Sequence, residues 1–296
     1  MSKISVVIPS VSGLPVIAEC LDALARQRGG VEAEVIVVDR CRNGTATMIA
    51  ERFPWVDLLT RDEQQGIPQL RAAGIERATG EIVVITEDHC IAPDNWFEEI
   101  LKAHDSGYMV VGGAVENGSV RRITDWASFF CEYSQVMPPV PSGEVKNIPG
   151  NNASYSREVL LGVAEDVKQN CWEYYLHEDL RSRGFRFLSS PGIIVTHKKE
   201  FGILFFLAQK FHYSRSFAAM RITQLTGSGR LLYICATPVL PLLLLWRVCR
   251  EVMRRKKHYK ELILSLPLLS LFGVSYACGE LAGYLFGQGR SLAKVE

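Results

Sequence analysis

The stretch Ile82-Val83-Val84-Ile85-Thr86-Glu87-Asp88-His89 places four consecutive β-branched apolar residues just before a group of ionisable side chains. A continuous apolar run of this length predicts a strand that is covered on both faces, as in a parallel sheet. An unpaired carboxylate would be costly inside such a strand, whereas at its carboxyl end it can serve a ligand. We therefore expect Glu87, Asp88 and His89 to lie at the rim of a buried sheet.

Two earlier runs have the same form. Ile4 to Ile8 leads into Pro9, and Val35 to Val38 leads into Asp39, with apolar residues at helical spacing between the two runs. This alternation of strand and helix predicts an α/β fold with a doubly wound, mostly parallel sheet. Ligands of such sheets bind beyond the carboxyl ends of the strands. Pro9, Asp39 and residues 87–89 should therefore converge in space.

The group at residues 87–89 has the chemistry of a divalent-cation site. Carboxylate oxygens suit Mg²⁺, and the imidazole makes Mn²⁺ a better candidate than it would be in an all-oxygen site. A cation at this place would neutralise a diphosphate leaving group. The alternative is an acidic cap that is solvated at the end of the strand.

The composition is that of a folded protein without a strong net charge. The 296 residues are 48% hydrophobic and 22% charged, with a formal net charge of +1. These values argue against a disordered chain and against nucleic acid as a partner. Eight scattered cysteines form no Cys-x-x-Cys pair, as is typical of a reduced, cytosol-facing domain. The first residues lack the features of a signal peptide, so we expect the domain to face the cytoplasm.

Three segments, taken in order, resemble the family 2 glycosyltransferases. Gly80 to Trp96 has the family's Gly-Glu strand, its acidic metal motif and the Cys, Pro and Trp that follow. Gly66 to Gly74 is similar to the family's Gly-x-x-x-Ala-Arg-Asn-x-Gly segment, and Ser5 to Asp39 is similar to its opening strand, helix and strand. The resemblance covers about residues 4–200 and implies a GT-A-type catalytic domain over residues 1–200.

The sequence departs from the family pattern at two places. Glu87-Asp88-His89 stands where the family has Asp-x-Asp, which leaves the metal and its ligands open. Asp39 is retained, but it is followed by Arg40-Cys41-Arg42, where the family often continues its Asp with Asp-Gly-Ser.

The resemblance implies a nucleotide-sugar donor, most often a UDP-sugar. Pro9 and Ser10 would line the nucleoside pocket, and Asp39 would bind the base. Arg71 and Asp88 would lie at the donor diphosphate, Arg71 as a charged hydrogen-bond donor. Two alternatives remain: Asp39 could cap the turn that follows it, and Arg71 could lie on the surface of a helix.

The segment Gly150-Asn151-Asn152 resembles the family's Gly-x-Asn segment, which lies near the donor sugar and the acceptor. Gly150 allows close backbone approach, and Asn152 offers both a donor and an acceptor to sugar hydroxyls. The alternative is an ordinary Asn-rich turn before a helix.

Sugar transfer with inversion needs one general base to take the acceptor proton. Counting back from Gly184, the family's acidic motif falls on Glu173, which we interpret as the base. The pair Glu178-Asp179 resembles the motif by letter but not by spacing, and a solvated helix face explains it. His197 directly follows the apolar run 193–196, and it ligates the metal, contacts the diphosphate or is structural.

The remainder of the chain predicts a membrane-associated helical region. Residues 201–229 mix aromatic and basic residues, as in an amphipathic interfacial segment, and a plain surface helix is the alternative. Residues 230–288 contain two hydrophobic membrane segments with a basic loop at 247–260 between them, and residues 289–296 form a tail. A loop this basic is normally cytoplasmic, which conflicts with two full crossings, so we favour a re-entrant first segment.

We therefore expect an inverting glycosyltransferase that moves a sugar from a nucleoside-diphosphate donor to a lipid-linked or membrane-proximal acceptor. It should lie at membrane lipid, with its catalytic domain facing the cytoplasm. A catalytically degenerate domain that serves as a membrane scaffold or nucleotide-sugar sensor is the alternative from another class. A sugar-phosphate nucleotidyltransferase is disfavoured because residues 10–15 contain no Lys or Arg.

Overall fold

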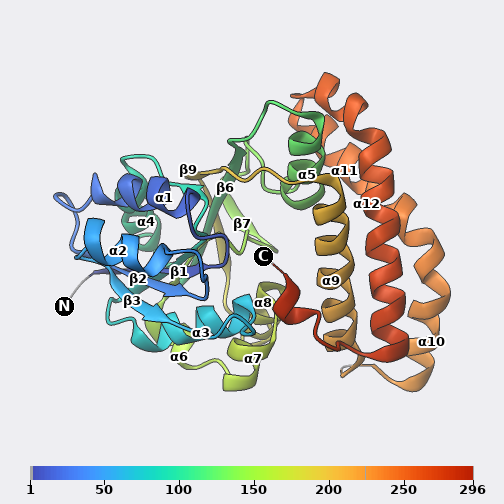
Figure 1. The fold of residues 1–296 in the computed structure, drawn as a ribbon, viewed down its shortest axis with the longest axis horizontal. Coiled ribbons are helices and arrows are strands. Elements are labelled where there is room, and N and C mark those ends of the chain that lie inside the picture. The colour runs from blue at the N-terminus through green and yellow to red at the C-terminus, as the bar shows by residue number, and fades with distance from the viewer. Residues whose placement is uncertain (1–2, 224, 296) are drawn as a thin grey trace. The chain divides into compact units, whose positions relative to one another are not determined.

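The structure is a computed structural model that describes residues 3–223 and 225–295, and it divides the chain into two compact units (Figure 1). The first unit consists of the described part of Met1–Gly118 together with Val136–Lys198. The second consists of Ser119–Gln135 and the described part of Lys199–Glu296. The predicted boundary near residue 200 is therefore close, but residues 119–135 do not belong to the sheet unit where we expected them.

The first half of the sheet is parallel, as the apolar runs predict. Its order is β3-β2-β1-β4, and each neighbouring pair is parallel. The strands are β1 (Ile4–Ser10), β2 (Ala33–Asp39), β3 (Asp57–Thr60) and β4 (Ile82–Thr86). All seven residues of β1 are buried, because a strand in this position has neighbours on both edges and helices on both faces.

The second half of the sheet is mixed, which the sequence did not indicate. It continues as β8-β6-β9-β5; β8 is antiparallel to both β4 and β6, β6 and β9 are parallel, and β9 is antiparallel to β5 and β7. The strands are β5 (Cys90–Ile91), β6 (Val110–Asn117), β7 (Gly143–Val145), β8 (Asn152–Ser156) and β9 (Phe187–His197). The apolar run at 193–196 is part of β9.

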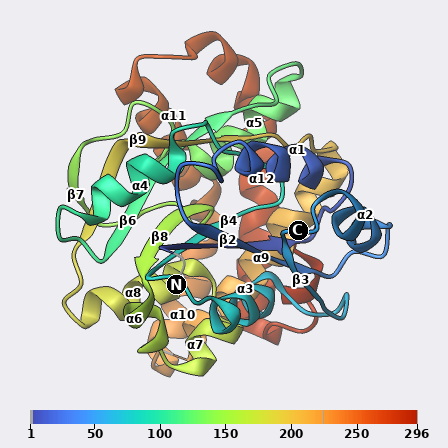
Figure 2. The same ribbon diagram turned by 90° about the vertical axis from the view of Figure 1, so that its left-hand side faces the viewer.

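Helices cover both faces of this sheet. Helices α1 and α4 lie on one side, whereas α3, α6, α7 and α8 lie on the other (Figures 1 and 2). On the second side, Val7 of β1 belongs to one core cluster with Leu70 and Ile75 of α3. The helices of this unit are α1 (Val16–Ala25), α2 (Thr45–Arg52), α3 (Ile67–Arg77), α4 (Trp96–His104), α6 (Arg157–Leu161), α7 (Glu165–Asn170) and α8 (Glu173–Ser182).

The second unit is helical. Helix α5 packs against α11 and α12, which explains why residues 119–135 belong to this unit. Its elements are α5 (Ile123–Tyr133), α9 (Ile203–Ile222), α10 (Gly227–Ala236), η1 (Thr237–Val239), α11 (Leu240–Arg255), α12 (Tyr259–Phe286) and η2 (Leu292–Lys294).

Helices α9 and α12 lie side by side in close contact (Figure 1). Gly279 and Gly283 of α12, four residues apart, form the contact face. A Cβ at Gly279 would lie 2.3 Å from the carbonyl oxygen of Phe211, and one at Gly283 would lie 2.5 Å from that of Arg215. Small residues at this spacing let two helix backbones approach, as is common in membranes.

Two helical segments are long and apolar enough to cross a membrane, judged by length and composition. They are Gly227–Arg255, with 29 residues, and Tyr259–Phe286, with 28, and each reaches a mean hydropathy of 1.8. Pro238 lies in the short turn η1 and Pro241 in the first turn of α11, positions that tolerate proline. The first segment is therefore longer than the apolar run indicated.

Two predictions about this region need correction. Most of the expected basic loop at 247–260 is helix, because α11 continues to Arg255 and α12 begins at Tyr259. Only residues 256–258 separate the two helices. The segment 201–229, which we expected to be interfacial throughout, is one long helix only as far as Ile222. Lys210 of that helix does not face the surface: it is buried, and its Nζ lies 2.6 Å from Glu132 Oε1.

Candidate active site

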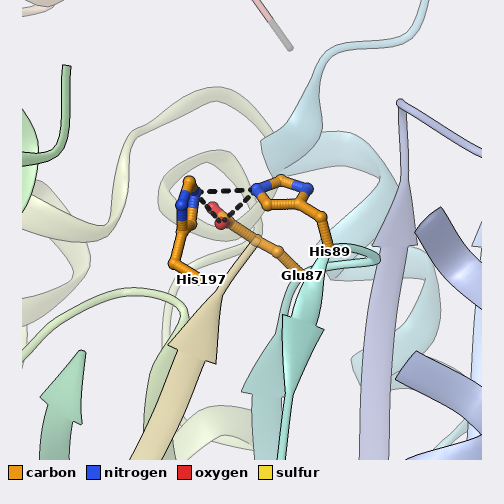
Figure 3. A group of neighbouring side chains, drawn as sticks. All are labelled: Glu87, His89 and His197. Carbon is orange, nitrogen blue, oxygen red and sulfur yellow. Dashed lines mark hydrogen bonds and ion pairs between the residues drawn. The ribbon is translucent and has the colours of Figure 1, made fainter. Parts of the chain in front are cut away.

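Three side chains from two strand ends converge at the carboxyl edge of the sheet (Figure 3). Glu87 follows β4, His89 comes two residues later, and His197 ends β9, where it pairs with Cys90 of β5. The two imidazole Nε2 atoms are 2.9 Å apart. Glu87 Oε2 lies 3.2 Å from Nε2 of His89 and 4.0 Å from Nε2 of His197. Strand pairing thus brings together residues 108 positions apart.

The chemistry of these three side chains fits a divalent cation. One carboxylate oxygen and two imidazole nitrogens lie within 4.8 Å of one another, and all three point toward a common place (Figure 3). Both imidazoles are buried, whereas Glu87 is partly exposed. Two nitrogens and one oxygen suit Mn²⁺ or a later transition metal better than Mg²⁺, which prefers oxygen ligands. His197, which could have been structural, lies in this cluster.

The carboxylate of Glu87 is kept in the charged form that a cation would need. Burial raises its pKa, but the hydrogen bond to His89 and the charges of His89 and His197 outweigh burial and lower the pKa to about 2. Asn151 also contributes, because its Nδ2 donates to Glu87 Oε2 at 3.1 Å. No sequence pattern points to Asn151, because it is the variable middle residue of the Gly-x-Asn segment.

Asp88 lies outside this cluster, contrary to its assignment as a metal and donor ligand. Its side chain is fully buried and turns toward the loop that follows β1. Oδ2 accepts from the backbone N–H groups of Val11, Ser12 and Gly13 at 2.8–2.9 Å, and Oδ1 lies 2.7 Å from His89 Nδ1. These four partners are all groups of the protein itself.

Ser10 and Asp39 lie side by side, because they pair at the ends of β1 and β2. Asp39 Oδ1 accepts from Ser10 Oγ at 2.8 Å and from the N–H of Cys41 at 3.2 Å, so this oxygen caps the turn. Asp39 Oδ2 is buried and has no hydrogen-bond partner among the described residues. The two interpretations of Asp39 are therefore compatible, one for each oxygen. Pro9 is buried in β1 beside Val38.

Arg71 is not a surface residue, and its guanidinium is used inside the protein. It is fully buried on α3. Nη1 donates to the carboxylate of Glu173, and Nη2 donates to the carbonyl oxygen of Cys171 at 2.8 Å. We expected the guanidinium of Arg71 to contact the donor diphosphate, but both of its Nη groups donate to groups of the protein itself. Sequence reasoning missed the pair because its members are 102 residues apart.

Glu173 begins helix α8, and its side chain is 25% exposed. It packs against Gly150, where an added Cβ would lie 2.6 Å from Glu173 Cγ. The close approach that glycine allows at this position is therefore to Glu173. Glu178 and Asp179, which we expected on a solvated helix face, are at least partly exposed and pair with Arg181 and Arg183.

Asn152 is a buried part of the sheet, and its assignment to sugar recognition stays a prediction. Its Oδ1 accepts from Trp96 Nε1 at 3.1 Å. Its Nδ2 donates to the carbonyl oxygens of Ala114 at 2.8 Å and Ile193 at 3.2 Å. These bonds connect β8 to α4, β6 and β9, and they use the amide groups through which Asn152 was expected to bind a sugar.

Residues 5–162 match the protein-family model described as "Glycosyl transferase family 2". Glycosyltransferase AglE of Haloferax volcanii is 32% identical over 119 residues, which are 38% of this chain and 39% of the relative. The glucosyl-dolichyl phosphate glucuronosyltransferase of the same organism is 30% identical over 121 residues, 36% of each chain. The matched segments thus span less than two fifths of either relative.

A solved structure is similar over nearly the whole chain. It is the mannosyltransferase PcManGT from Pyrobaculum calidifontis in complex with GDP-Man and Mn2+. The TM-score is 0.59 at 18% identity, and the alignment covers 96% of this chain and 87% of that one. At this identity the likeness concerns the fold, and it confirms the fold type predicted from the sequence.

Proposed function

The chain belongs to glycosyl transferase family 2, and from that premise we propose which reaction this glycosyltransferase performs and with which residues. It transfers a sugar, with inversion, from a nucleoside-diphosphate donor to a lipid-linked or membrane-proximal acceptor. A UDP-sugar is the donor that we propose first. The proposal rests on the arrangement of the carboxyl edge of the sheet.

One observation carries the proposal: the consecutive residues Gly150 and Asn151 contact the proposed base and the proposed cation site, respectively. Gly150 packs against Glu173, and the side chain of Asn151 donates to Glu87 of the cation cluster. The proposed base and the proposed cation site are thus fixed to neighbouring backbone positions. A transferase that inverts needs this arrangement, because the base must activate the acceptor while the diphosphate is stabilised from the other side.

Each group then has a defined task. A divalent cation held by Glu87, His89 and His197 would supply positive charge to the departing diphosphate. Glu173 accepts the proton of the acceptor hydroxyl, and Arg71 holds its carboxylate in one orientation. Asp39 Oδ2 accepts a hydrogen bond from the base or ribose of the donor, beside Ser10.

A lipid-linked acceptor is supported by two features. The chain carries two helical segments of membrane-spanning length in its second unit. One relative is named for a dolichyl phosphate substrate, which is a lipid carrier. We place the catalytic unit on the cytoplasmic side, where nucleotide sugars would reach it.

The topology can be tested at the junction of α11 and α12. The variant Lys257→Cys, treated with an impermeant thiol reagent, is compared with the wild type in intact cells and in inverted vesicles. Labelling only in inverted vesicles supports a re-entrant Gly227–Arg255 and a cytoplasmic catalytic unit. Labelling only in intact cells would support two full crossings and contradict the re-entrant segment.

The reaction is tested with a panel of nucleotide sugars. Membranes that contain the full chain are incubated with each donor, with and without Mn²⁺, and the lipid products are analysed by mass. We expect one donor to give a glycolipid in a Mn²⁺-dependent reaction, with inverted configuration at the anomeric carbon. No metal-dependent product from any donor would favour the scaffold or sensor instead.

A further inference from the structure

Asp88 contacts two parts of the proposed site, the loop that follows β1 and the imidazole of His89. Its side chain is fully buried, although a carboxylate without compensating partners would be very costly there. Four N–H groups point at its two oxygens. Three come from the backbone after β1, and the fourth is on the ring of His89.

The three backbone donors form an anion-binding concavity, and the carboxylate of Asp88 occupies it. Val11, Ser12 and Gly13 present successive N–H groups to a single oxygen, at 2.9, 2.8 and 2.9 Å. Successive N–H groups of this kind often hold a phosphate or another anion. Here the carboxylate comes from a residue more than seventy positions later, so the loop is fixed to the end of β4. The loop directly follows Ser10, which we assign to the nucleoside pocket.

The other oxygen sets the orientation of a cation ligand. Asp88 Oδ1 lies 2.7 Å from Nδ1 of His89, and a carboxylate can only accept, so the proton of this bond is on Nδ1. With the Nδ1 proton held in this way, a cation that displaces the proton which Nε2 shares with Glu87 would meet the Nε2 lone pair on the side of Glu87 and His197. Carboxylates that hold ligating histidines in this way commonly raise metal affinity.

We infer that Asp88 is a positioning residue that couples cation binding at His89 to nucleoside binding by the loop of residues 10–13. This inference rests on the proposed function and goes beyond it. The cation and the nucleotide communicate through the protein, in addition to any direct contact between the ion and the diphosphate. Occupation of either site favours the single arrangement of Asp88 in which the other site is formed.

The substitution Asp88→Asn separates this role from that of an ordinary ligand. An amide has one oxygen and one NH₂ group, so it cannot accept from both the loop and the imidazole. If its oxygen serves the loop, its NH₂ faces Nδ1 and favours the opposite tautomer of His89. If its oxygen serves the imidazole, its NH₂ faces three N–H donors. The variant must therefore weaken one or both sites, although its shape is unchanged.

The test measures each ligand alone on the full-length protein in detergent. Binding of Mn²⁺ without nucleotide is followed by electron paramagnetic resonance, and binding of UDP and of GDP without metal by calorimetry. We expect Asp88→Asn to weaken Mn²⁺ binding about 10- to 100-fold and nucleotide binding about tenfold. His89→Gln, which removes a ligand and leaves the loop intact, should weaken only Mn²⁺ binding.

Asp125→Asn is the matched control. Asp125 is also a buried carboxylate that accepts a backbone N–H, that of Arg122 at 3.0 Å, but it lies in the helical unit. This variant should bind both ligands as the wild type does. If it weakens both as much as Asp88→Asn, the effect is general destabilisation and the inference is wrong.

Hydrogen exchange gives a second measurement that does not depend on the variant folding. In the wild type, Mn²⁺ alone should slow amide exchange at residues 11–13, because the ion fixes His89 and hence Asp88. Unchanged exchange there, or an Asp88→Asn variant that binds both Mn²⁺ and nucleotide as the wild type does, would overturn the inference while the proposed function stands. A wild type that binds neither Mn²⁺ nor nucleotide would overturn both.

Discussion

The cation cluster (Glu87, His89 and His197) and the Glu173–Arg71 pair both hold polar side chains in a defined orientation, but they do so with different structural elements. In the cluster, the three proposed ligands Glu87, His89 and His197 project from the ends of strands, and buried Asp88 contacts the imidazole of His89. In the pair, the functional carboxylate is in the first turn of a ten-residue helix, remains 25% exposed, and is held by one buried arginine. The difference suits the tasks, because an ion needs fixed ligands whereas a base must meet an acceptor that comes and goes.

The largest effect should come from the exposed carboxylate of the pair. Glu173→Gln removes the proton acceptor but keeps the volume, so kcat should fall about 10²- to 10⁴-fold, with donor binding unchanged. The measurement is glycolipid formation together with nucleotide calorimetry. Glu178→Gln, five residues later on the same helix and paired with Arg181, is the control and should retain full activity. Equal losses in the two variants would remove Glu173 from the mechanism.

The next largest effect is a loss of Mn²⁺ affinity, which should follow from changes in the cluster but not in the pair. His197→Ala removes one of three ligands, so Mn²⁺ affinity should fall about 100-fold while nucleotide binding without metal is retained. The folded state should persist, because the ring lies at the end of β9. His104→Gln is the control, since His104 is a partly buried imidazole of α4 that contacts Ser154. Unchanged Mn²⁺ affinity in His197→Ala would show that β9 contributes no ligand.

A smaller effect tests how the pair is held. Arg71→Lys keeps the positive charge but loses the fork that reaches Glu173 and the carbonyl oxygen of Cys171 together. We expect kcat to fall about tenfold, with Mn²⁺ affinity as in the wild type. The matched control is Arg157→Lys, because Arg157 also donates to a carbonyl oxygen, that of Ala78 at 2.7 Å. A loss of Mn²⁺ affinity in Arg71→Lys would mean that the two regions are not separate.

The last effect concerns the stability of the fold near the pair, through His177, a buried imidazole of α8. Burial, and then the charges of Arg71 and Arg181, lower the pKa of His177 to about 3, and its Nε2 lies 2.7 Å from Tyr155 Oη. The folded state binds this proton less readily than the unfolded state, whose pKa is about 6.5. The contribution of neutral His177 to stability is therefore complete above pH 6.5 and declines as the pH falls toward 3.

Denaturant unfolding checks this pH dependence. Between pH 7 and pH 5, the wild type should lose about 1–2 kcal/mol more of its free energy of unfolding than His177→Gln, which has no proton to bind. Parallel pH profiles of the two proteins would contradict this account of His177.

The sequence predicted the cluster better than the pair for a physical reason. Glu87, Asp88 and His89 are consecutive, and an apolar run places them at a strand end whatever the rest of the fold is. The partners of buried polar groups depend on tertiary contacts, so the same reasoning did not predict the hydrogen bonds that Asp88, Asn152 and Arg71 make inside the protein. Burial made each of these residues part of a hydrogen-bonded framework.

The fold shows the same division. Long β-branched runs predicted β1, β2 and β4 and their parallel order. Strands β5, β7 and β8 contain no continuous β-branched apolar run like that of β4, so the antiparallel half was not predicted. Helix α5 belongs to the helical unit because of packing with α11 and α12, which no local pattern reports.

The most direct test of the central claim is the detection of imidazole nitrogen on the bound cation. Mn²⁺ bound to the full-length wild type should show electron spin-echo modulation from two imidazole nitrogens, and from one after His197→Ala. Mn²⁺ bound without nitrogen modulation, or with the same modulation in His89→Ala and His197→Ala, would contradict the assignment of Glu87, His89 and His197 as the cation site.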